Sequence, residues 1–346
     1  MDLINYNVKK LLTLLSYKRS TKKAHTTLKN IELWKGKIPK NLIQQSDEYA
    51  KDVLGSKRYA PWLYVYSVFN GEFKEGWIPD NYYEEHIIPK LKGGYGLLSS
   101  NRGLSKILFD AEFFPDLYYR INNLWFDNTY TSISNENLHK KLLKTNKSIF
   151  KNDSSARGEG VIIFDENSIN TNILERLGNG VVQEFIRQHS FFDAIEQNSI
   201  ATIRLTSVSE ENGSIKIVAA YLRVGRSNDK VVKSSSHIRV PISIDTGELD
   251  EFAYDTNWLQ ISKHPDSGYL FSKQQIPHYD KCIEAVKKLH SKIPFVRIIG
   301  WDLIVDSDGK VQVMEWNGKH NDIKFSEATQ GPIFKGMGFE NLWKKS

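Results

Sequence analysis

The chain has 346 residues, of which 40% are hydrophobic and 25% charged. This composition indicates a globular protein with two or three packed units and excludes an intrinsically disordered chain. The net charge of +6 and the pI near 9.0 favour anionic partners such as nucleotide phosphates, acidic glycans or lipid surfaces, and no nucleic acid partner is expected. The single cysteine, Cys282, fits a reducing compartment, and no stretch is apolar enough to span a membrane, so we expect a cytoplasmic protein.

Residues 1–30 form a basic segment in which lysines and arginines far outnumber the one acid, Asp2, with leucines between them (Leu11, Leu12, Leu14, Leu15). Such a segment can lie on an anionic bilayer, which would be a peripheral association with the inner membrane surface. A solvated basic face over a small docking stripe is the favoured alternative.

Aromatic residues are dense from Trp34 to Gly96, and prolines divide this region into short elements. We therefore expect an α-rich N-terminal domain over residues 1–100. Within it, Ile78-Pro79-Asp80 precedes a helical pattern, which predicts a helix start with Asp80 as the N-cap.

Residues 137–147 have a helical pattern and are followed by two strands, 148–151 and 161–164, with a polar loop between them. The small residues of this loop would let backbone N–H groups approach phosphate oxygens, and Lys151 and Arg157 add positive charge. A plain surface turn is the alternative.

Three further strands are expected at 181–186, 200–208 and 215–224. The first carries Gln183 and Glu184 near its end, and the other two each carry one arginine among apolar residues, Arg204 and Arg223. Arginine is rarely buried unpaired, so the pair implies an anion. That anion is either a carboxylate side chain, such as Glu184 or Glu315, or a transferring phosphoryl group.

The helical pattern of residues 280–290 leads into an expected hairpin over 300–317, with Asp308 and Gly309 as its two turn residues. That turn places Asp302 opposite Glu315, and Asn317 lies on the same face. Hard oxygen ligands of this kind suit Mg²⁺. Alternatively, each acid pairs with a lysine or a backbone group.

Over residues 100–320 the chain resembles the ATP-grasp family. The resemblance rests on the loop after Lys151, the Gln183-Glu184 strand end, the strand arginines Arg204 and Arg223, and Asp302 followed by Glu315-x-Asn317. Within this family, the segments around Gln183, Arg204, Arg223 and Asp302 look most like the sugar-transfer-associated ATP-grasp proteins of exopolysaccharide biosynthesis. The resemblance implies an α+β ATP-grasp fold that follows the α-rich N-terminal domain in the chain. It would consist of a nucleotide-binding lid subdomain over 101–186 and a C-terminal subdomain with the metal site over 187–346.

The resemblance also implies roles for individual residues. Lys106 and Lys151 would hold the phosphates of ATP, the loop from Ser154 to Gly160 would close over them, and Gln183, Glu184 and Ile186 would line the adenine pocket. Arg204 and Arg223 would bind the transferring phosphoryl group, and Asp302, Glu315 and Asn317 would hold Mg²⁺. The loop residues concerned are Ser154, Ser155, Gly158 and Gly160. Ser235-Ser236-His237 departs from the glycine pair that this subgroup tends to carry.

The expected function is that of an ATP-dependent carboxylate–amine ligase acting through an acyl-phosphate. Its substrates would be an acid and an amine, with the acid a uronic acid, nucleotide sugar or polysaccharide precursor. Two alternatives remain: a sugar kinase with the same fold, and a non-catalytic nucleotide- or glycan-binding module.

Overall fold

The computed structural model describes residues 2–110, 112–153, 160–227 and 236–345. By its internal contacts the chain forms two compact units. The first takes in Met1–Gly93, Tyr254–Ile261 and His320–Ser346, and the second takes in Gly94–Ala253 and Ser262–Lys319. This division differs from the three consecutive segments expected, because the C-terminal segment belongs to the same unit as the N-terminal one. The functional domains at 1–100, 101–186 and 187–346 stay a prediction.

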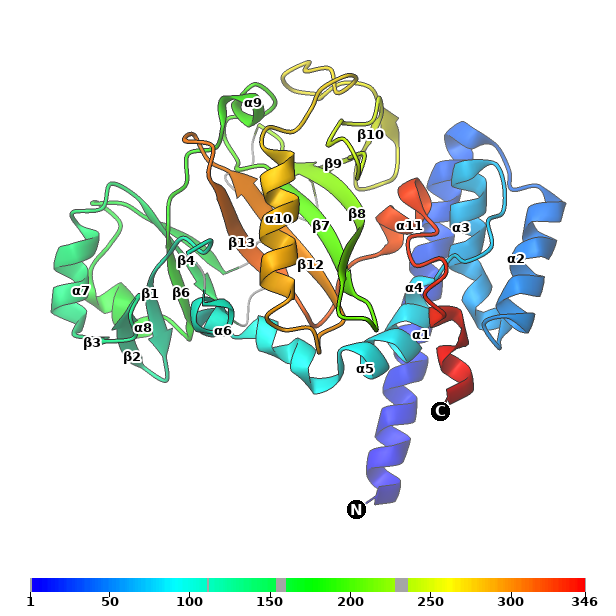
Figure 1. Ribbon diagram of the computed structural model, residues 1–346, viewed down its shortest axis with the longest axis horizontal. Helices are drawn as coiled ribbons and strands as arrows, with labels where there is room; N and C mark the ends of the chain where they lie inside the picture. Colours follow the sequence, from blue (N-terminus) through cyan, green and yellow to red (C-terminus); the bar gives the residue numbers. More distant parts are fainter. Residues whose placement is uncertain (1, 111, 154–159, 228–235, 346) are drawn as a thin grey trace. The chain divides into compact units, whose positions relative to one another are not determined.

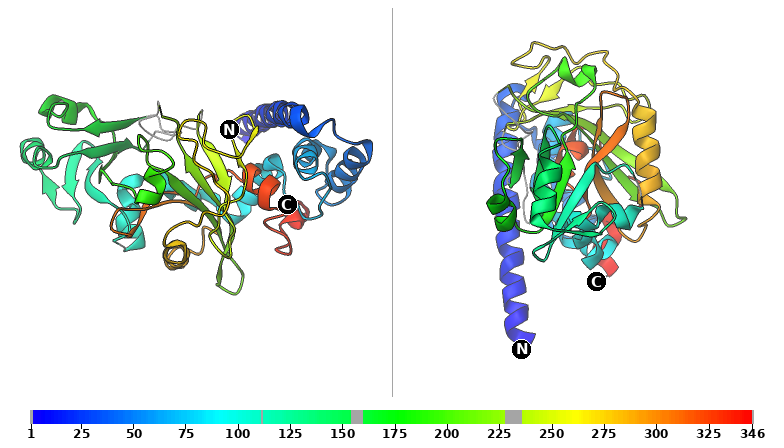
Figure 2. Two further views of the ribbon diagram at one scale, coloured as in Figure 1. Left: turned by 90° about the horizontal axis from the view of Figure 1, so that it is seen from above. Right: turned by 90° about the vertical axis from the view of Figure 1, so that its left-hand side faces the viewer.

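The first unit is helical, which confirms the α-rich N-terminal region. Its helices are α1 (Asp2–Lys35), α2 (Lys40–Asp52), η1 (Lys57–Tyr59), α3 (Ala60–Asn70), α4 (Asp80–Tyr82), η2 (Tyr83–Ile87), α5 (Ile88–Leu91), α11 (Lys324–Gln330) and η5 (Phe339–Lys345). Figure 2 shows α1 as one continuous helix.

The C-terminal half of α1 packs on α3 through one stripe of buried side chains at helical spacing: Ser20, Ala24, Thr27 and Ile31. Trp62 on α3 donates a hydrogen bond from its indole nitrogen to the Ser20 hydroxyl at 3.0 Å. This half of α1 therefore carries a docking stripe. Membrane association of residues 1–30 stays a prediction.

Asp80 does not cap a helix. Pro79 is the cap residue of α4, and Asp80 is the first residue inside the helix. The Asp80 carboxylate is buried and lies 3.0 Å from the ammonium of Lys324, which also lies 2.9 Å from Asp322. The predicted N-cap was therefore wrong by one residue, and the carboxylate forms an ion pair instead.

The second unit contains two antiparallel sheets. The smaller has the strand order β3-β2-β1-β6-β4-β5. Its strands are β1 (Asp116–Ile121), β2 (Leu124–Asp127), β3 (Ser132–Ile133), β4 (Ser148–Asn152), β5 (Val161–Phe164) and β6 (Gly180–Glu184). Two short helices, α7 (Asn135–Leu142) and α8 (Thr171–Arg176), accompany this sheet (Figure 1).

The smaller sheet and its two helices share one hydrophobic core. The core is formed by Trp125, Leu138, Leu142, Phe150, Phe164, Ile169, Leu174 and Val182. Since alternate residues of a strand face opposite sides, this leaves Lys151 and Gln183 on the other face of the sheet. The core thus fixes which strand residues can take part in a site.

The larger sheet contributes the strand order β9-β8-β7-β12-β13 to this unit. These strands are β7 (Thr202–Ser209), β8 (Ile215–Val224), β9 (Ile238–Pro241), β12 (Ile298–Val305) and β13 (Val311–Asn317). Two-residue strands β10 (Ala253–Tyr254) and β11 (Gln260–Ile261) lie between β9 and β12 in the chain. The expected strands over 200–208 and 215–224 are confirmed to within two residues.

Helix α10 (Tyr279–His290) lies against β7, β8, β12 and β13 (Figure 1). Its buried face includes Cys282, Val286 and Leu289, and the predicted helix over 280–290 is confirmed. The remaining short helices are η3 (Gly93–Ser100), η4 (Arg102–Leu104), α6 (Ser105–Phe109) and α9 (Ser190–Asp193). The helical first unit and the two antiparallel sheets confirm the expected α+β class.

Candidate active site

Asp302 and Glu315 are directly opposite each other in the β12–β13 hairpin, as the sequence predicted. The expected two-residue turn, however, is wrong. The Asp306 N–H donates to the Lys310 carbonyl at 2.9 Å, so three residues form the loop, and Gly309 adopts a left-handed φ of +75°.

A bulge restores the predicted pairing. Val305 pairs with Val311 and Leu303 with Val313, one residue away from the expected register. The register then shifts between Leu303 and Asp302, and the extra residue is Met314. Because the bulge offsets the longer loop, the two carboxylates still face each other.

Both strand arginines pair with Asp302. Arg204 on β7 lies directly opposite it, with Nε 2.5 Å from Oδ1 and Nη2 2.9 Å from Oδ2. Arg223 on β8 places Nη2 2.6 Å from Oδ2 of the same carboxylate. The anion implied by the two arginines is thus a carboxylate, but Asp302 rather than the expected Glu184 or Glu315.

The charges of neighbouring side chains determine the pKa values of Asp302 and Arg204. Burial alone would raise the pKa of Asp302, but the guanidinium groups of Arg204 and Arg223 outweigh burial and hold that pKa at about 2. The Asp302 charge in turn raises the pKa of Arg204 despite the burial of the guanidinium. Asp302 and Arg204 are therefore both charged at neutral pH.

Lys151, at the end of β4, reaches the same place from the smaller sheet. Its ammonium lies 3.4 Å from the carbonyl oxygen of Met314, the bulged residue beside Glu315. Burial lowers the pKa of Lys151 to about 8, although the Glu315 carboxylate partly counters that effect. The side chain of Lys151 is half-buried, and an anionic ligand would favour its charged form.

The loop after Lys151 is described only at its two ends. The Asn152 N–H donates to the carbonyl of Gly160 at 3.3 Å, and Gly160 has a left-handed φ of +73°, which favours glycine. The predicted phosphate-loop residues Ser154, Ser155 and Gly158 lie outside the described residues. Strands β4 and β5 confirm the hairpin that carries this loop.

The expected adenine-pocket residues lie at the end of β6. The Gln183 amide is buried and donates to the Asp116 carboxylate at 2.8 Å. Glu184 is exposed, and its N–H donates to the Pro115 carbonyl, while the Ile186 side chain is buried. The adenine role of these residues stays a prediction.

Lys106, on α6, is half-buried and close enough to Asp116 to act on its charge. Burial raises the pKa of Asp116, against the effect of hydrogen bonds from Gln183 and Tyr119. Asp116 therefore binds the predicted adenine residue Gln183 and lies within electrostatic range of Lys106, and sequence reasoning missed it.

A comparison with protein families shows which family the chain belongs to. The model of the family described as sugar-transfer associated ATP-grasp matches residues 114–337. The chain belongs to this family. Members of the ATP-grasp family are typically ATP-dependent ligases, and the resemblance expected from the sequence is confirmed.

Solved structures of ATP-grasp proteins are similar to this ATP-grasp chain at low identity. The N5-carboxyaminoimidazole synthetase from Staphylococcus aureus is 11% identical, with a TM-score of 0.38, over 65% of this chain and 45% of that one. The ATP-grasp ligase PsnB with its minimal precursor is 12% identical, with a TM-score of 0.37, over 74% of this chain and 64% of that one. The matched region is thus less than two thirds of the length of either protein. No curated protein matches the chain.

The donor set of this ATP-grasp chain fits a magnesium–nucleotide complex. Glu315 and the half-buried Asn317 offer hard oxygen atoms from β13, and the Asn317 amide nitrogen donates to the Gly300 carbonyl at 3.3 Å. The carboxylate of Asp302 lies directly opposite Glu315, but both its oxygens pair with Arg204 and Arg223, so its role as a metal ligand stays a prediction. Among the described residues around them, the five cations Arg102, Lys106, Lys151, Arg204 and Arg223 outnumber the four carboxylates of Asp116, Asp153, Asp302 and Glu315. The excess of positive charge suits phosphate groups.

Sequence reasoning missed two arginines of this cluster. Arg239 on β9 is buried directly opposite Arg223, within the apolar run Ile238-Arg239-Val240. The same pattern had identified Arg204 and Arg223, so Arg239 could have been found. Arg102 stands in a polar turn where no local pattern marks it.

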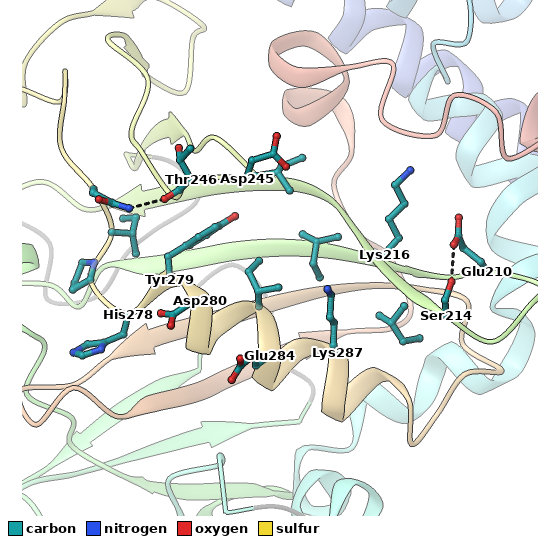
Figure 3. A pocket seen from close by; sticks show the side chains of 17 residues that line it. Glu210, Ser214, Lys216, Asp245, Thr246, His278, Tyr279, Asp280, Glu284 and Lys287 are labelled. Atoms are coloured by element: carbon teal, nitrogen blue, oxygen red, sulfur yellow. Dashed lines mark hydrogen bonds between the residues drawn. The ribbon is translucent and has the colours of Figure 1, made fainter.

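A groove of about 980 Å³ lies elsewhere in the second unit, between α10 and the β7–β8 hairpin (Figure 3). Charged side chains of both signs line it, among them Lys216, Asp245, Glu284 and Lys287, and Tyr279 lies along it. None of the predicted site residues lines this groove. It is therefore separate from the candidate active site.

Glu196, His264 and Asp266 also come close enough together to be considered as metal ligands, with their ligand atoms within 4.8 Å of one another. Both ring nitrogens of His264 already contact protein groups, the Gly225 carbonyl and Ser267. Asp266 pairs both its oxygens with Arg226 at 2.8 Å. The trio is a hydrogen-bond network at the end of β8.

Among the described residues, every helix is too short or too polar to cross a lipid bilayer.

Proposed function

We propose that this chain is an ATP-dependent carboxylate–amine ligase that activates its acid substrate as an acyl-phosphate. The acid we propose is a uronic acid, a nucleotide sugar or another polysaccharide precursor, and the second substrate is an amine. This reaction consumes ATP, so we place the protein in the cytoplasm. The observation that carries the proposal is the charged cluster in which Arg204 and Arg223 both pair with Asp302. Glu315 lies directly opposite Asp302, and the ammonium of Lys151 lies beside Glu315, at the Met314 carbonyl.

The chemistry of the proposed reaction explains why such a site needs charges and no side-chain nucleophile. A carboxylate is a poor acyl donor, because its oxygen leaves badly. Transfer of the γ-phosphoryl group to that oxygen breaks the bond to ADP and forms an acyl-phosphate. An amine then attacks the acyl carbon, phosphate leaves, and the amine loses a proton. Positioning and charge neutralisation supply most of the catalysis in phosphoryl transfer.

The residues of the cluster would divide this work. Lys151 and Lys106 would bind phosphate oxygens, and Arg204 and Arg223 would neutralise the phosphoryl group and the developing acyl-phosphate. Mg²⁺, held by Asp302, Glu315 and Asn317, would neutralise the phosphates when bound. Cys282 is buried on α10 and its pKa is raised to about 12 by burial, so its thiol is a poor candidate for a nucleophile.

Three measurements on the purified protein test this function. The first is ADP release with Mg·ATP across a panel of uronic acids and nucleotide uronic acids, with and without amines. The second is hydroxamate formation when hydroxylamine replaces the amine, which traps an acyl-phosphate. The third repeats both with Glu315→Gln, which should reduce turnover at least about 100-fold.

The alternatives predict different outcomes. A kinase would release a stable phosphorylated sugar without any amine and would give no hydroxamate. A binding module would bind ATP without turnover on every acid and amine pair. ATP turnover that is unaffected by Glu315→Gln would overturn the proposed function.

A further inference from the structure

Arg102 joins three segments of the second unit that are far apart in the sequence. It stands at the start of η4, between the two sheets, and its side chain is only 13% exposed. Its Nη1 donates to the carbonyl oxygens of Asn152 at 2.7 Å and Asp153 at 3.2 Å, and its Nη2 lies 3.3 Å from Oε1 of Glu315. One guanidinium thus connects the end of β4, where the phosphate loop begins, to the predicted metal ligand on β13.

The backbone around Arg102 is also fixed by hydrogen bonds. The Arg102 N–H donates to Oδ1 of Asp153 at 2.9 Å. The neighbouring Gly103 carbonyl accepts a hydrogen bond from the Tyr130 hydroxyl at 2.7 Å, and the Ser105 hydroxyl accepts one from the indole of Trp316 at 3.2 Å. Contacts from both sheets therefore fix where the guanidinium can reach.

The two predicted acidic metal ligands differ in how they are neutralised. Asp302 has two arginines on its own sheet, whereas Glu315 pairs with a residue outside that sheet. A guanidinium and a divalent cation both need the same negative charge, and each repels the other at short range. Occupation of Glu315 by a metal ion would therefore weaken its contact with Arg102.

We propose that Arg102 is a positioning residue whose ion pair with Glu315 competes with a divalent cation for that carboxylate. Once the cation has replaced it, the guanidinium still contacts the start of the phosphate loop, where a phosphate oxygen can become its new partner. The inference rests on the proposed function, because it takes Glu315 as a cation ligand. It adds a residue that couples metal binding to the phosphate loop.

The competition predicts opposite effects on two affinities when the guanidinium is removed. Arg102→Gln should bind Mn²⁺ in the absence of nucleotide about 3-fold or more tightly than the unsubstituted protein, because Glu315 loses its competitor. The same substitution should weaken ATP binding about 10-fold, because one charge-assisted contact is lost. A merely structural role would weaken both. Arg102→Lys, which keeps the charge, should bind Mn²⁺ with an affinity near that of the unsubstituted protein.

The experiment titrates Mn²⁺ into each protein and follows free Mn²⁺ by electron paramagnetic resonance, with and without ATP. Arg297→Gln is the matched control, because Arg297 also donates to a backbone carbonyl, that of Ser209, away from the cluster. Urea unfolding checks that each variant is folded. Should Arg102→Gln not fold, Arg102→Met takes its place, because it also removes the charge and keeps much of the length of the side chain, and the same gain in Mn²⁺ affinity is expected.

The outcomes distinguish a failure of the Arg102 inference from a failure of the proposed function. Mn²⁺ affinity that is unchanged or weaker in Arg102→Gln overturns the inference while leaving the proposed function intact, provided that Mn·ATP binding still depends on Glu315. Mn·ATP binding that is the same in Glu315→Gln and the unsubstituted protein overturns the metal site itself, and with it the proposed function.

Discussion

Arg204 holds both carboxylate oxygens of Asp302 in a two-pronged contact between directly paired residues of β7 and β12. The side chains of Arg204 and Asp302 are only 7% and 6% exposed. A buried carboxylate without its partner is costly, because neither water nor another group solvates it. This contact should therefore contribute to folding as well as to phosphate chemistry.

Arg204→Ala should lower the free energy of unfolding by about 3 kcal/mol, since it leaves Asp302 with one arginine in place of two. Arg223→Ala should cost less, because the Arg223 side chain is 21% exposed. Urea unfolding followed by tryptophan fluorescence measures both. Equal losses of unfolding free energy for the two variants would contradict the expectation that the more buried arginine contributes more to stability.

Lys151 should make ATP binding dependent on pH. Its pKa of about 8 means that it loses its charge as the pH rises through 8 in the nucleotide-free protein. The association constant for ATP should then fall, by up to about tenfold per pH unit. Calorimetric titration between pH 7 and 9.5 measures this. Lys151→Arg stays charged throughout and should give a nearly flat profile, and two parallel profiles would exclude Lys151 as the titrating group.

The same shift has a consequence for stability. Because the folded pKa lies below the usual value of 10.5, the unfolded chain binds more protons between about pH 8 and 10.5. The contribution of Lys151 to the free energy of unfolding should therefore become more favourable as the pH rises through that window. Lys151→Met should remove this part of the pH dependence, which urea unfolding at several pH values would show. A slope unchanged by Lys151→Met would contradict it.

Much of the candidate site followed from local patterns. Apolar runs interrupted by one arginine placed Arg204 and Arg223 on neighbouring strands, because strand periodicity is local. The pairing of Asp302 with Glu315 was predicted from a turn that the structure does not have, and the bulge at Met314 corrected the register. Such compensation depends on packing against the rest of the sheet, so no sequence pattern reveals it.

Other features could not be predicted because distant segments create them. The contacts of Arg102 form only because η4, the end of β4 and β13 lie close together in the folded unit. Asp80 looked like an N-cap because it precedes a helical pattern, but Lys324, from the C-terminal part of the same unit, takes its carboxylate. Local propensity cannot describe an ion pair whose partners are so far apart in the chain.

The buried pair of Asp80 and Lys324 should be a main tie between α4 and α11 in the first unit. Nearby carboxylates, those of Asp322 and Asp80, outweigh the burial of Lys324 and raise its pKa above the usual value, so it stays charged. Lys324→Met should cost about 3 to 5 kcal/mol of the free energy of unfolding, because it leaves Asp80 buried and unpaired. The double variant with Asp80→Asn should recover part of that loss. A double-mutant cycle measured by urea unfolding gives the coupling, and strictly additive losses would contradict it.

The N-terminal segment calls for a test that spares the fold. Deleting residues 1–30 would remove Ser20, Ala24 and Thr27, which pack on α3, and would confuse binding with unfolding. A chain that starts at Leu15 keeps this stripe and loses Leu11, Leu12 and Leu14 together with Lys9 and Lys10. If residues 1–30 bind an anionic bilayer, the shortened chain should co-sediment with phosphatidylserine vesicles at low salt several-fold less than the full chain. Neutral phosphatidylcholine vesicles are the control, since they lack the charge that attracts lysine, and equal co-sedimentation of both chains would leave the segment as a solvated basic face.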